Sequence, residues 1–309
     1  MILVVMAKKL TRTQKFIGPA SLITIGLLFG LSGVMAKYLS EWLTAYQVVE
    51  YRFAIALIAL LFISLIFKLK ISLKGTSKRI LALYAVTFPL SVILFTLSVF
   101  NGSVALAVFT FYTATLVSSF IIGRIWFKEK IHVYKQLALI AILISIIAFT
   151  DPFNNFGVNL GLIFGLFSGV IQGIASSFQK LLSNNANKTS LLLYQCLAGV
   201  TLSVIALLFA GEPTYTELGL MQWIVVILFG LAMLAITYLF LIGFKYTNLN
   251  TGSVLVSSEL FFGPFFAYFL LSEGLSSGIL IGGLFTIIAV IFSTLNDPTQ
   301  GLKKKKKSR

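Results

Sequence analysis

The sequence predicts an all-α integral membrane protein with ten transmembrane helices, arranged as two inverted five-helix repeats around a central cavity. Three observations predict this fold class: the composition, the spacing of the apolar runs and the distribution of the basic residues. Of the 309 residues, 58% are hydrophobic and only 11% are charged, whereas an ordinary soluble domain has about 25% charged residues. The mean hydropathy is +1.00. A soluble core cannot bury so much apolar surface, so the composition favours a polytopic membrane protein.

Ten apolar runs are long enough to cross a bilayer, which takes about 20 residues in a helix. Charged or turn-rich breaks such as "KLKISLKGTSKR" and "AGEPTYTEL" separate most of them, and only "NGS" separates the third run from the fourth. The predicted spans are 17–36, 43–67, 80–100, 103–123, 132–150, 158–181, 190–210, 220–243, 250–271 and 278–295.

The basic residues support this number of spans through the positive-inside rule. If the N-terminus lies in the cytoplasm, all of the 24 Lys and Arg residues except Lys37 and Arg52 fall in or beside a cytoplasmic segment. A missing or extra span would reverse this alternation after the error. We therefore expect both termini in the cytoplasm and the chain in the cytoplasmic membrane. The predicted external segments carry acidic residues instead: Glu41, Asp151, Glu212, Glu217 and Glu273.

The chain also repeats itself. "LLFGLSGV" (27–34) resembles "LIFGLFSGV" (162–170), and "FKEKI" (127–131) occupies the place in the first half that "LSEGL" (271–275) occupies in the second. Because five spans is an odd number, the second repeat enters the membrane from the opposite side, an architecture typical of transporters. The predicted organisation is a cytoplasmic N-terminal segment (1–16), a first repeat (17–150), an external linker (151–157), a second repeat (158–296) and a basic cytoplasmic tail (297–309).

Small residues recur at every fourth position in three spans. This spacing places them on one helix face and lets two backbones approach closely. The pattern indicates tight helix packing, and a second interpretation is that these faces slide against each other during transport. The residues are Gly157, Gly161, Gly165, Gly169 and Gly173 in the sixth span, Gly26 and Gly30 in the first, and Gly278 and Gly282 in the tenth.

Several segments together resemble a known family. They are "FGLSGVMAK" (29–37), with Phe29 where a Trp is usual, "EYRFAIALIAL" (50–60), "NGSVALAVFTFYTATL" (101–116), "GFKYTNLNTGSVLVSSEL" (243–260) and "FLLSEGL" (269–275). In this order the segments resemble the EamA-type transporters of the drug/metabolite transporter superfamily, in two copies over nearly the whole chain. Leu116 and Leu260 stand where the family pattern often has Pro. The resemblance implies ten helices around a cavity and transport of small metabolites, often amino acids or their derivatives, and often as export.

Three ionisable residues fall inside predicted spans: Glu50, Arg52 and Glu259. Such groups are costly in a membrane and usually face protein or water. Glu50 and Arg52 are two residues apart, so they point to nearly opposite sides of a helix and cannot pair with each other. Arg52 either bridges helices through their carbonyl groups or binds a substrate carboxylate or phosphate. Glu259 and Glu50 are either structural or proton carriers for coupling.

Polar side chains within apolar spans supply further candidates for the cavity. Tyr112 and Tyr238 are predicted near the middle of the fourth and eighth spans, where their hydroxyl groups need partners. Gln172 and Asn101 are weaker candidates. Most of the 29 Phe residues are expected to fill the core or face lipid.

The sequence argues against catalytic, metal and nucleic-acid functions. With one Cys (Cys196) and one His (His132), neither a disulfide framework nor a zinc site is expected. The string "GLSG" (30–33) matches that of an intramembrane serine protease, but His132 is predicted at the other edge of the membrane from Ser32. There is no phosphate-binding loop for ATP, and no cofactor is expected. The basic residues lie in loops and in the tail "KKKKKSR", which we expect to contact anionic lipid rather than nucleic acid.

The sequence-based hypothesis is therefore a secondary active transporter, most simply an exporter of small metabolites such as amino acids or related compounds, that works by alternating access. The alternative is a membrane protein that does not transport: a scaffold, a receptor or a lipid-handling protein with the same fold. A polar cavity near the midplane would favour transport, and a uniformly apolar one would favour the alternative.

Overall fold

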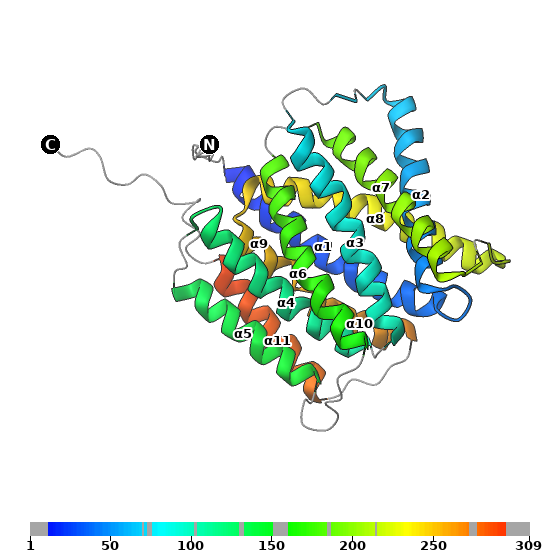
Figure 1. Cartoon of the computed structure of the whole chain (residues 1–309). Coiled ribbons are helices and arrows are strands. Elements are labelled where there is room, and N and C mark those ends of the chain that lie inside the picture. Colours follow the sequence, from blue (N-terminus) through cyan, green and yellow to red (C-terminus); the bar gives the residue numbers. More distant parts are fainter. Residues whose placement is uncertain are drawn as a thin grey trace.

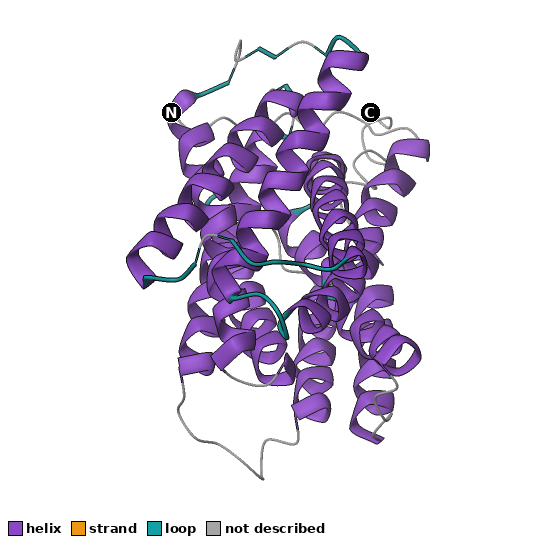
Figure 2. Ribbon diagram, turned by 90° about the vertical axis from the view of Figure 1, so that its right-hand side faces the viewer, coloured by secondary structure: helices purple, strands orange, loops and turns teal. Residues whose placement is uncertain are grey.

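In this computed structural model, every regular element is a helix among the residues described, which are 12–69, 71–72, 76–101, 104–129, 133–150, 160–183, 187–213, 215–271 and 277–294 (Figure 1). Figure 2 shows these helices side by side in one bundle. They are α1 (Arg12–Leu39), α2 (Ala45–Ile66), α3 (Lys78–Asn101), α4 (Val104–Ile125), α5 (Val133–Thr150), α6 (Leu160–Leu182), α7 (Lys188–Ala210), α8 (Leu220–Tyr246), α9 (Leu249–Val256), α10 (Glu259–Leu271) and α11 (Ser277–Thr294). The predicted linker, His132, Glu273 and the basic tail lie outside the described residues.

Seven segments within the described part of the chain are long and apolar enough to cross a membrane. They are Phe16–Leu39, Ala45–Ile66, Lys78–Asn101, Leu160–Leu182, Lys188–Ala210, Leu220–Tyr246 and Leu249–Leu270. Two shorter apolar stretches, Val133–Ser145 and Leu280–Phe292, belong to α5 and α11. The structure therefore gives an all-helical membrane protein with several spans, and the number ten stays a prediction.

The ninth predicted span is not one continuous helix. The α-helical pattern stops at Ser257, whose backbone N–H donates to Ser253 O (3.2 Å), and the next bonds tighten to three-residue steps: Ser258 N–H to Leu255 O (3.2 Å) and Leu260 N–H to Ser257 O (2.9 Å). The helix resumes at Glu259 as α10. Such a break is tolerated in a membrane where the backbone is buried in protein or lines a cavity.

The most extensive helix contacts repeat between the two halves. We count α9 and α10 together as the fourth helix of the second half. The contact between α3 and α6 then corresponds to the contact between α8 and α1. The contact between α4 and α6 corresponds to the contact of α9 and α10 with α1. Likewise, the contact between α2 and α8 corresponds to the contact between α7 and α3. Two further contacts join helices that occupy the same place in their halves: α2 packs on α7, and α5 packs on α11. Exchanging the halves therefore leaves the set of main contacts unchanged.

The glycine faces lie in these contacts, in agreement with the packing interpretation. On α6, a Cβ added at Gly173 would meet the side chain of Ser118 on α4. On α1, a Cβ added at Gly26 would meet Ser258 and the backbone of Glu259 at the helix break. Without the missing side chains, α6 could not approach α4, and α1 could not approach the break, this closely.

Candidate functional site

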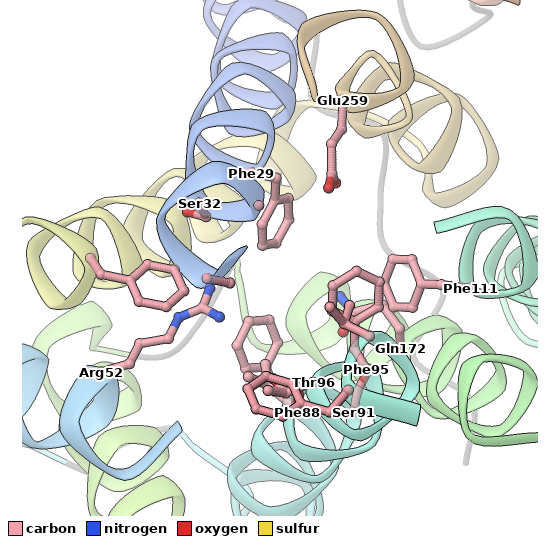
Figure 3. Close-up of a pocket in the computed structure, with 16 residues that line it drawn as sticks. Phe29, Ser32, Arg52, Phe88, Ser91, Phe95, Thr96, Phe111, Gln172 and Glu259 are labelled. Atoms are coloured by element: carbon pink, nitrogen blue, oxygen red, sulfur yellow. The ribbon is translucent and has the colours of Figure 1, made fainter. Parts of the chain in front are cut away.

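A cavity lies between helices of both halves, in the part of the bundle toward which α1 and α3 end (Figure 3). Six of its sixteen lining residues are polar or charged, and six are phenylalanines. The lining residues are Phe29, Ser32, Gly33, Ala36, Arg52, Phe88, Ser91, Val92, Phe95, Thr96, Val99, Phe100, Phe111, Gln172, Phe229 and Glu259. The cavity is thus aromatic with a few polar groups, as binding sites for small molecules usually are.

The start of α2 positions the first charged group, Arg52. The helix begins with a capping box in which Gln47 N–H donates to Thr44 Oγ1 (3.3 Å) and Thr44 N–H donates to Gln47 Oε1 (3.0 Å). Gln47 Nε2 also donates to Pro213 O (2.7 Å) and to Thr216 Oγ1 (2.8 Å), which fixes this end of α2 to the loop before α8. Arg52 follows on the buried face of the helix.

Arg52 is only 7% exposed and has an aromatic neighbour in place of an anionic one. Its guanidinium carbon lies 4.4 Å from the centroid of the Phe229 ring on α8, within the range of a cation–π interaction. Its Nε atom is buried and has no hydrogen-bond partner. A guanidinium that lacks a paired carboxylate keeps its planar set of donors for a ligand.

The helix break positions the second charged group, Glu259. Because Glu259 is the first residue of α10, its carboxylate projects from the break into the cavity. Its Oε2 atom accepts a hydrogen bond from the Tyr112 hydroxyl on α4. Tyr112 is 1% exposed and is packed among Leu116, Phe120 and Leu260, so it holds the carboxylate in place from the protein side.

Arg52 and Glu259 enter the same space from two sides, one from each half of the chain (Figure 3). Their formal charges are opposite. Among the residues described, however, neither is bonded to the other: Arg52 lies over Phe229, and Glu259 accepts from Tyr112. The arrangement leaves a cationic and an anionic group facing one aromatic chamber, which suits a ligand that carries both charges.

Serine hydroxyl groups attach α3 to α6 beside this chamber, and one of these serines, Ser91, belongs to the lining. Ser91 Oγ donates to Ser168 O (3.0 Å), and Ser168 Oγ donates in return to Ser91 O (2.7 Å). Ser98 Oγ donates to Gly161 O (2.6 Å) in the same contact. Gln172, one turn beyond Ser168, lines the cavity and is 5% exposed. Because these bonds cross between the two halves, they hold the wall that carries Gln172.

The cavity brings together some of the predicted residues and not others. Arg52, Gln172 and Glu259 line it, and Tyr112 contacts it through Glu259. Tyr238 does not: it is 44% exposed, with Lys188 Nζ 4.8 Å from its ring centroid. The reason is rotational, because the buried face of α8 contains Thr237 and the next residue turns about 100° away.

Two other predicted residues lie outside the cavity lining: Asn101, expected as a weaker cavity candidate, and Glu50, expected as a possible proton carrier. Asn101 is exposed at the end of α3, and its Nδ2 donates to Leu97 O (2.8 Å) within its own helix. Glu50 is half-buried and does not line the cavity, and its Oε2 has no hydrogen-bond partner. Glu50 and Arg52 do face different surroundings, as their helical spacing predicts.

Sequence reasoning missed the aromatic partner of Arg52. Phe229 is one of 29 Phe residues in the chain, and nothing in its local sequence distinguishes it. It also missed Ser32, because the string "GLSG" gives no indication that this serine lines a cavity. Ser32 lines the cavity, and its Oγ donates to Leu28 O (2.7 Å) within α1. Within the described residues, no group of three or more His, Cys, Asp or Glu side chains is placed to hold a metal ion.

Comparison with known proteins gives two findings. The sequence profile of the EamA-like transporter family matches the chain twice, at residues 16–150 and 159–295. A solved chain described as "Crystal structure of protein" is similar in structure with a TM-score of 0.74 and 13% sequence identity, over 92% of this chain and 96% of that chain. At this identity the likeness shows the fold alone. No curated protein matches the sequence.

Proposed function

Because the chain belongs to the EamA-like transporter family, we propose that it is a secondary active transporter that exports small zwitterionic metabolites, such as amino acids or related compounds. The family and the apolar helices make it an integral multi-pass membrane protein. The basic residues support a location in the cytoplasmic membrane with both termini inside, and contact of the basic tail with anionic lipid.

One observation carries the proposed substrate class: Arg52 and Glu259 face the same aromatic cavity without bonding to each other. A substrate carboxylate would take the donors of Arg52, and a substrate ammonium would take the free face of the Glu259 carboxylate. The phenylalanine walls would then contact the apolar part of the substrate. The charged and polar groups of the lining also distinguish this cavity from the uniformly apolar one expected for a protein that does not transport.

Alternating access is supported by the arrangement of the helices. The main contacts are preserved when the halves are exchanged, as expected for two repeats of five spans that face opposite sides of the membrane. The break between α9 and α10 places Glu259 at a discontinuous helix, which transporters commonly use at a substrate site. The close glycine contacts give smooth surfaces along which one half can move against the other.

Glu259 is also the proposed proton carrier. It is the acidic residue of the cavity lining, and the substrate ammonium and a proton would compete for the same carboxylate. Glu50 is a second candidate because one of its oxygens is buried and unpartnered, although it lies outside the lining. In this arrangement a proton that enters from one side displaces the substrate toward the other.

The experiment is uptake and efflux of a panel of labelled amino acids and related zwitterions in proteoliposomes, with and without a pH gradient. We expect flux of at least one zwitterion, and loss of that flux in Arg52→Ala. The matched control is Arg124→Ala, which removes an exposed Arg in the last turn of α4. Unchanged flux in Arg52→Ala would exclude the proposed site. No flux of any compound from monodisperse protein would favour the non-transporting alternative.

A further inference from the structure

On the side of the cavity toward the start of α1, a stack of aromatic rings fills the bundle. Phe29 and Phe88 line the cavity, and both contact Phe240, with ring centroids 6.0 and 6.1 Å apart. Phe240 stacks in turn on Phe244, with centroids 5.7 Å apart and an interplanar angle of 13°. Phe88, Phe240 and Phe244 are at most 1% exposed. We call these four rings the aromatic plug, because they continue from the cavity lining to the end of α8 in an unbroken series of ring contacts.

The plug ends at the junction between α8 and α9, at the other end of the bundle from the cavity. Phe244 lies in the last turn of α8, and Thr247 and Asn248 connect the two helices. Gly18, near the start of α1, packs here, since a Cβ added to it would lie 2.6 Å from Thr247 Oγ1. The cavity-lining residues of α1, by contrast, lie in its second half, from Phe29 to Ala36.

Two charged side chains from other helices hold this junction. Glu129, which follows α4, accepts the first two N–H groups of α9: Oε1 from Leu249 N (2.7 Å) and Oε2 from Asn250 N (3.1 Å). Lys180, in the last turn of α6, donates from Nζ to Phe244 O (2.9 Å) and to Thr247 O. A carboxylate at a helix start and an ammonium at a helix end satisfy unpaired backbone groups and complement the helix dipoles.

The same junction contains buried polar atoms without partners. They include Thr247 Oγ1, Thr251 Oγ1 and both side-chain amide atoms of Asn250, all within residues that are at most 2% exposed. A buried polar atom without a hydrogen bond destabilises the arrangement that buries it, and water would satisfy it if the junction opened. Two sets of groups therefore act in opposite directions: these atoms favour opening, and the two charged contacts favour closure.

We propose that the aromatic plug and the α8–α9 junction form a gate, and that Glu129 and Lys180 are the latches that keep it shut while the cavity is open at the other end. The inference rests on the proposed transport function, since a gate needs a path to close. When the latches release, the end of α8 and the start of α9 separate from α4 and α6. Phe244 and Phe240 then withdraw from Phe29 and Phe88, and the cavity gains a second opening.

The test measures access to the gate by thiol labelling of the whole protein in proteoliposomes. Cys196 is the one cysteine of the chain, so Cys196→Ala gives a background without thiols. Thr251→Cys reports on the junction, and Ala36→Cys reports on the cavity. A membrane-impermeant maleimide is added to each side in turn. The latch variants are Glu129→Ala and Lys180→Met, and the matched controls are Glu41→Ala and Lys245→Met, which remove exposed charges.

We expect slow labelling of the Thr251→Cys reporter with intact latches, and labelling faster by about tenfold or more in either latch variant, the factor expected for losing a hydrogen bond to a charged group. The Ala36→Cys reporter should become slower in the same variants, because opening one gate reduces the population open at the other end. The two controls should change neither rate. If a latch variant aggregates, Glu129→Gln keeps the side-chain length and removes the charge, and Lys180→Gln removes the charge but retains a shorter polar side chain.

The outcomes separate this inference from the transport proposal, because labelling needs no substrate. Unchanged labelling of Thr251→Cys in folded variants of both latches would overturn the gate, whatever the flux measurements show. Faster labelling in both would support it. If the junction opens as expected but no compound is transported, the opening controlled by Glu129 and Lys180 stands and the proposed transport function is overturned.

Discussion

The contact of α6 with α4 and the contact of α1 with α9 and α10 use the same packing, but only the second contains a helix break and a carboxylate. A Cβ added at Gly169 of α6 would lie 2.7 Å from Ala114 Cβ, and one added at Gly30 of α1 would lie 2.7 Å from Gly263 N. Both distances are too short for a real side chain. In each half, therefore, glycines let the first helix pack closely on the fourth helix of the other half: α6 on α4, and α1 on α9 and α10.

The difference appears at equivalent positions of the two partners. Thr115 precedes Glu129 by the same number of residues as Glu259 precedes Glu273. Thr115 lies in the continuous helix α4, and its Oγ1 donates to Gly169 O (3.2 Å), so its polar group is satisfied inside the contact. Glu259 lies at the break and turns its carboxylate to the cavity. Glycine spacing thus encodes the packing of both contacts but does not show which one contains the carboxylate that lines the cavity.

The largest expected effect is a loss of stability when a side chain is added at a glycine of either helix contact. Gly169→Ala and Gly30→Ala should each lower the free energy of unfolding by about 3 kcal/mol, the upper end of the usual cost of overpacking, because backbone atoms nearby cannot rotate away. Gly33→Ala is the control, since a Cβ there would have nothing within 4 Å. Thermal unfolding in detergent measures the effect. If only one of the two variants is destabilised, the contacts are not equivalent.

The next largest effect is expected for Glu259→Gln, which should reduce transport without reducing stability. The substitution keeps the size of the side chain but removes the charge that would bind a substrate ammonium, so zwitterion flux should fall by about tenfold or more. The remaining flux should no longer respond to a pH gradient, while the unfolding temperature stays close to that of the wild type. Glu41→Gln, at an exposed position, is the matched control. Flux at the wild-type level would remove Glu259 from the site.

A smaller effect is expected for Tyr112→Phe, which removes only the hydroxyl that bonds to Glu259. The ring packing remains, so the carboxylate should be less firmly positioned rather than lost. We expect the apparent KM for the zwitterion to rise by about fivefold, less than the loss of a direct bond to a charged group, with little change in the maximal rate. Tyr238→Phe, at an exposed ring, should change neither quantity. A fall in the maximal rate alone would contradict a positioning role.

The smallest effect is expected for a substitution at Thr115, which occupies the position in α4 equivalent to that of Glu259. Thr115→Val removes the bond to Gly169 O and should lower the free energy of unfolding by about 1 kcal/mol, the usual net value of one hydrogen bond. Zwitterion flux should stay at the wild-type level, because this hydroxyl faces the α6 contact and does not line the cavity. If Thr115→Val reduced flux as strongly as Glu259→Gln, the two contacts would share the function after all.

The sequence was sufficient for an all-helical membrane protein, for the family and for the packing role of the glycines, while the ten spans and their inverted arrangement stay predictions. Apolar runs and basic loops report directly on membrane spans, and a spacing of four residues reports on one helix face. It also singled out Arg52 and Glu259, because a charge within an apolar run is conspicuous. Both line the cavity.

The remaining features depend on tertiary contacts that local sequence does not encode. The break at Ser257 and Ser258 occurs without Pro or Gly, beside the backbone of α1 at Gly26. The partner of Glu259 comes from Tyr112, far away in the chain. The outward position of Tyr238 is also not encoded locally, because α8 is apolar all round and no periodicity shows which of its faces is buried. An exposed surface toward lipid is as apolar as a core.

The pair of facing charges also has an electrical consequence. When the cavity is empty, or holds a zwitterion, the charges of Arg52 and Glu259 sum to zero, and the membrane potential does no net work on the cavity as it changes sides. Once Glu259 carries a proton, the cavity holds one positive charge, and moving that charge through the field is worth about 2.3 kcal/mol per 100 mV. Under the proposed mechanism, the membrane potential would not affect the step in which the cavity carries the zwitterion, and it would drive the step in which the cavity carries the proton. A potential that is negative inside would therefore pull the protonated form inward and favour export.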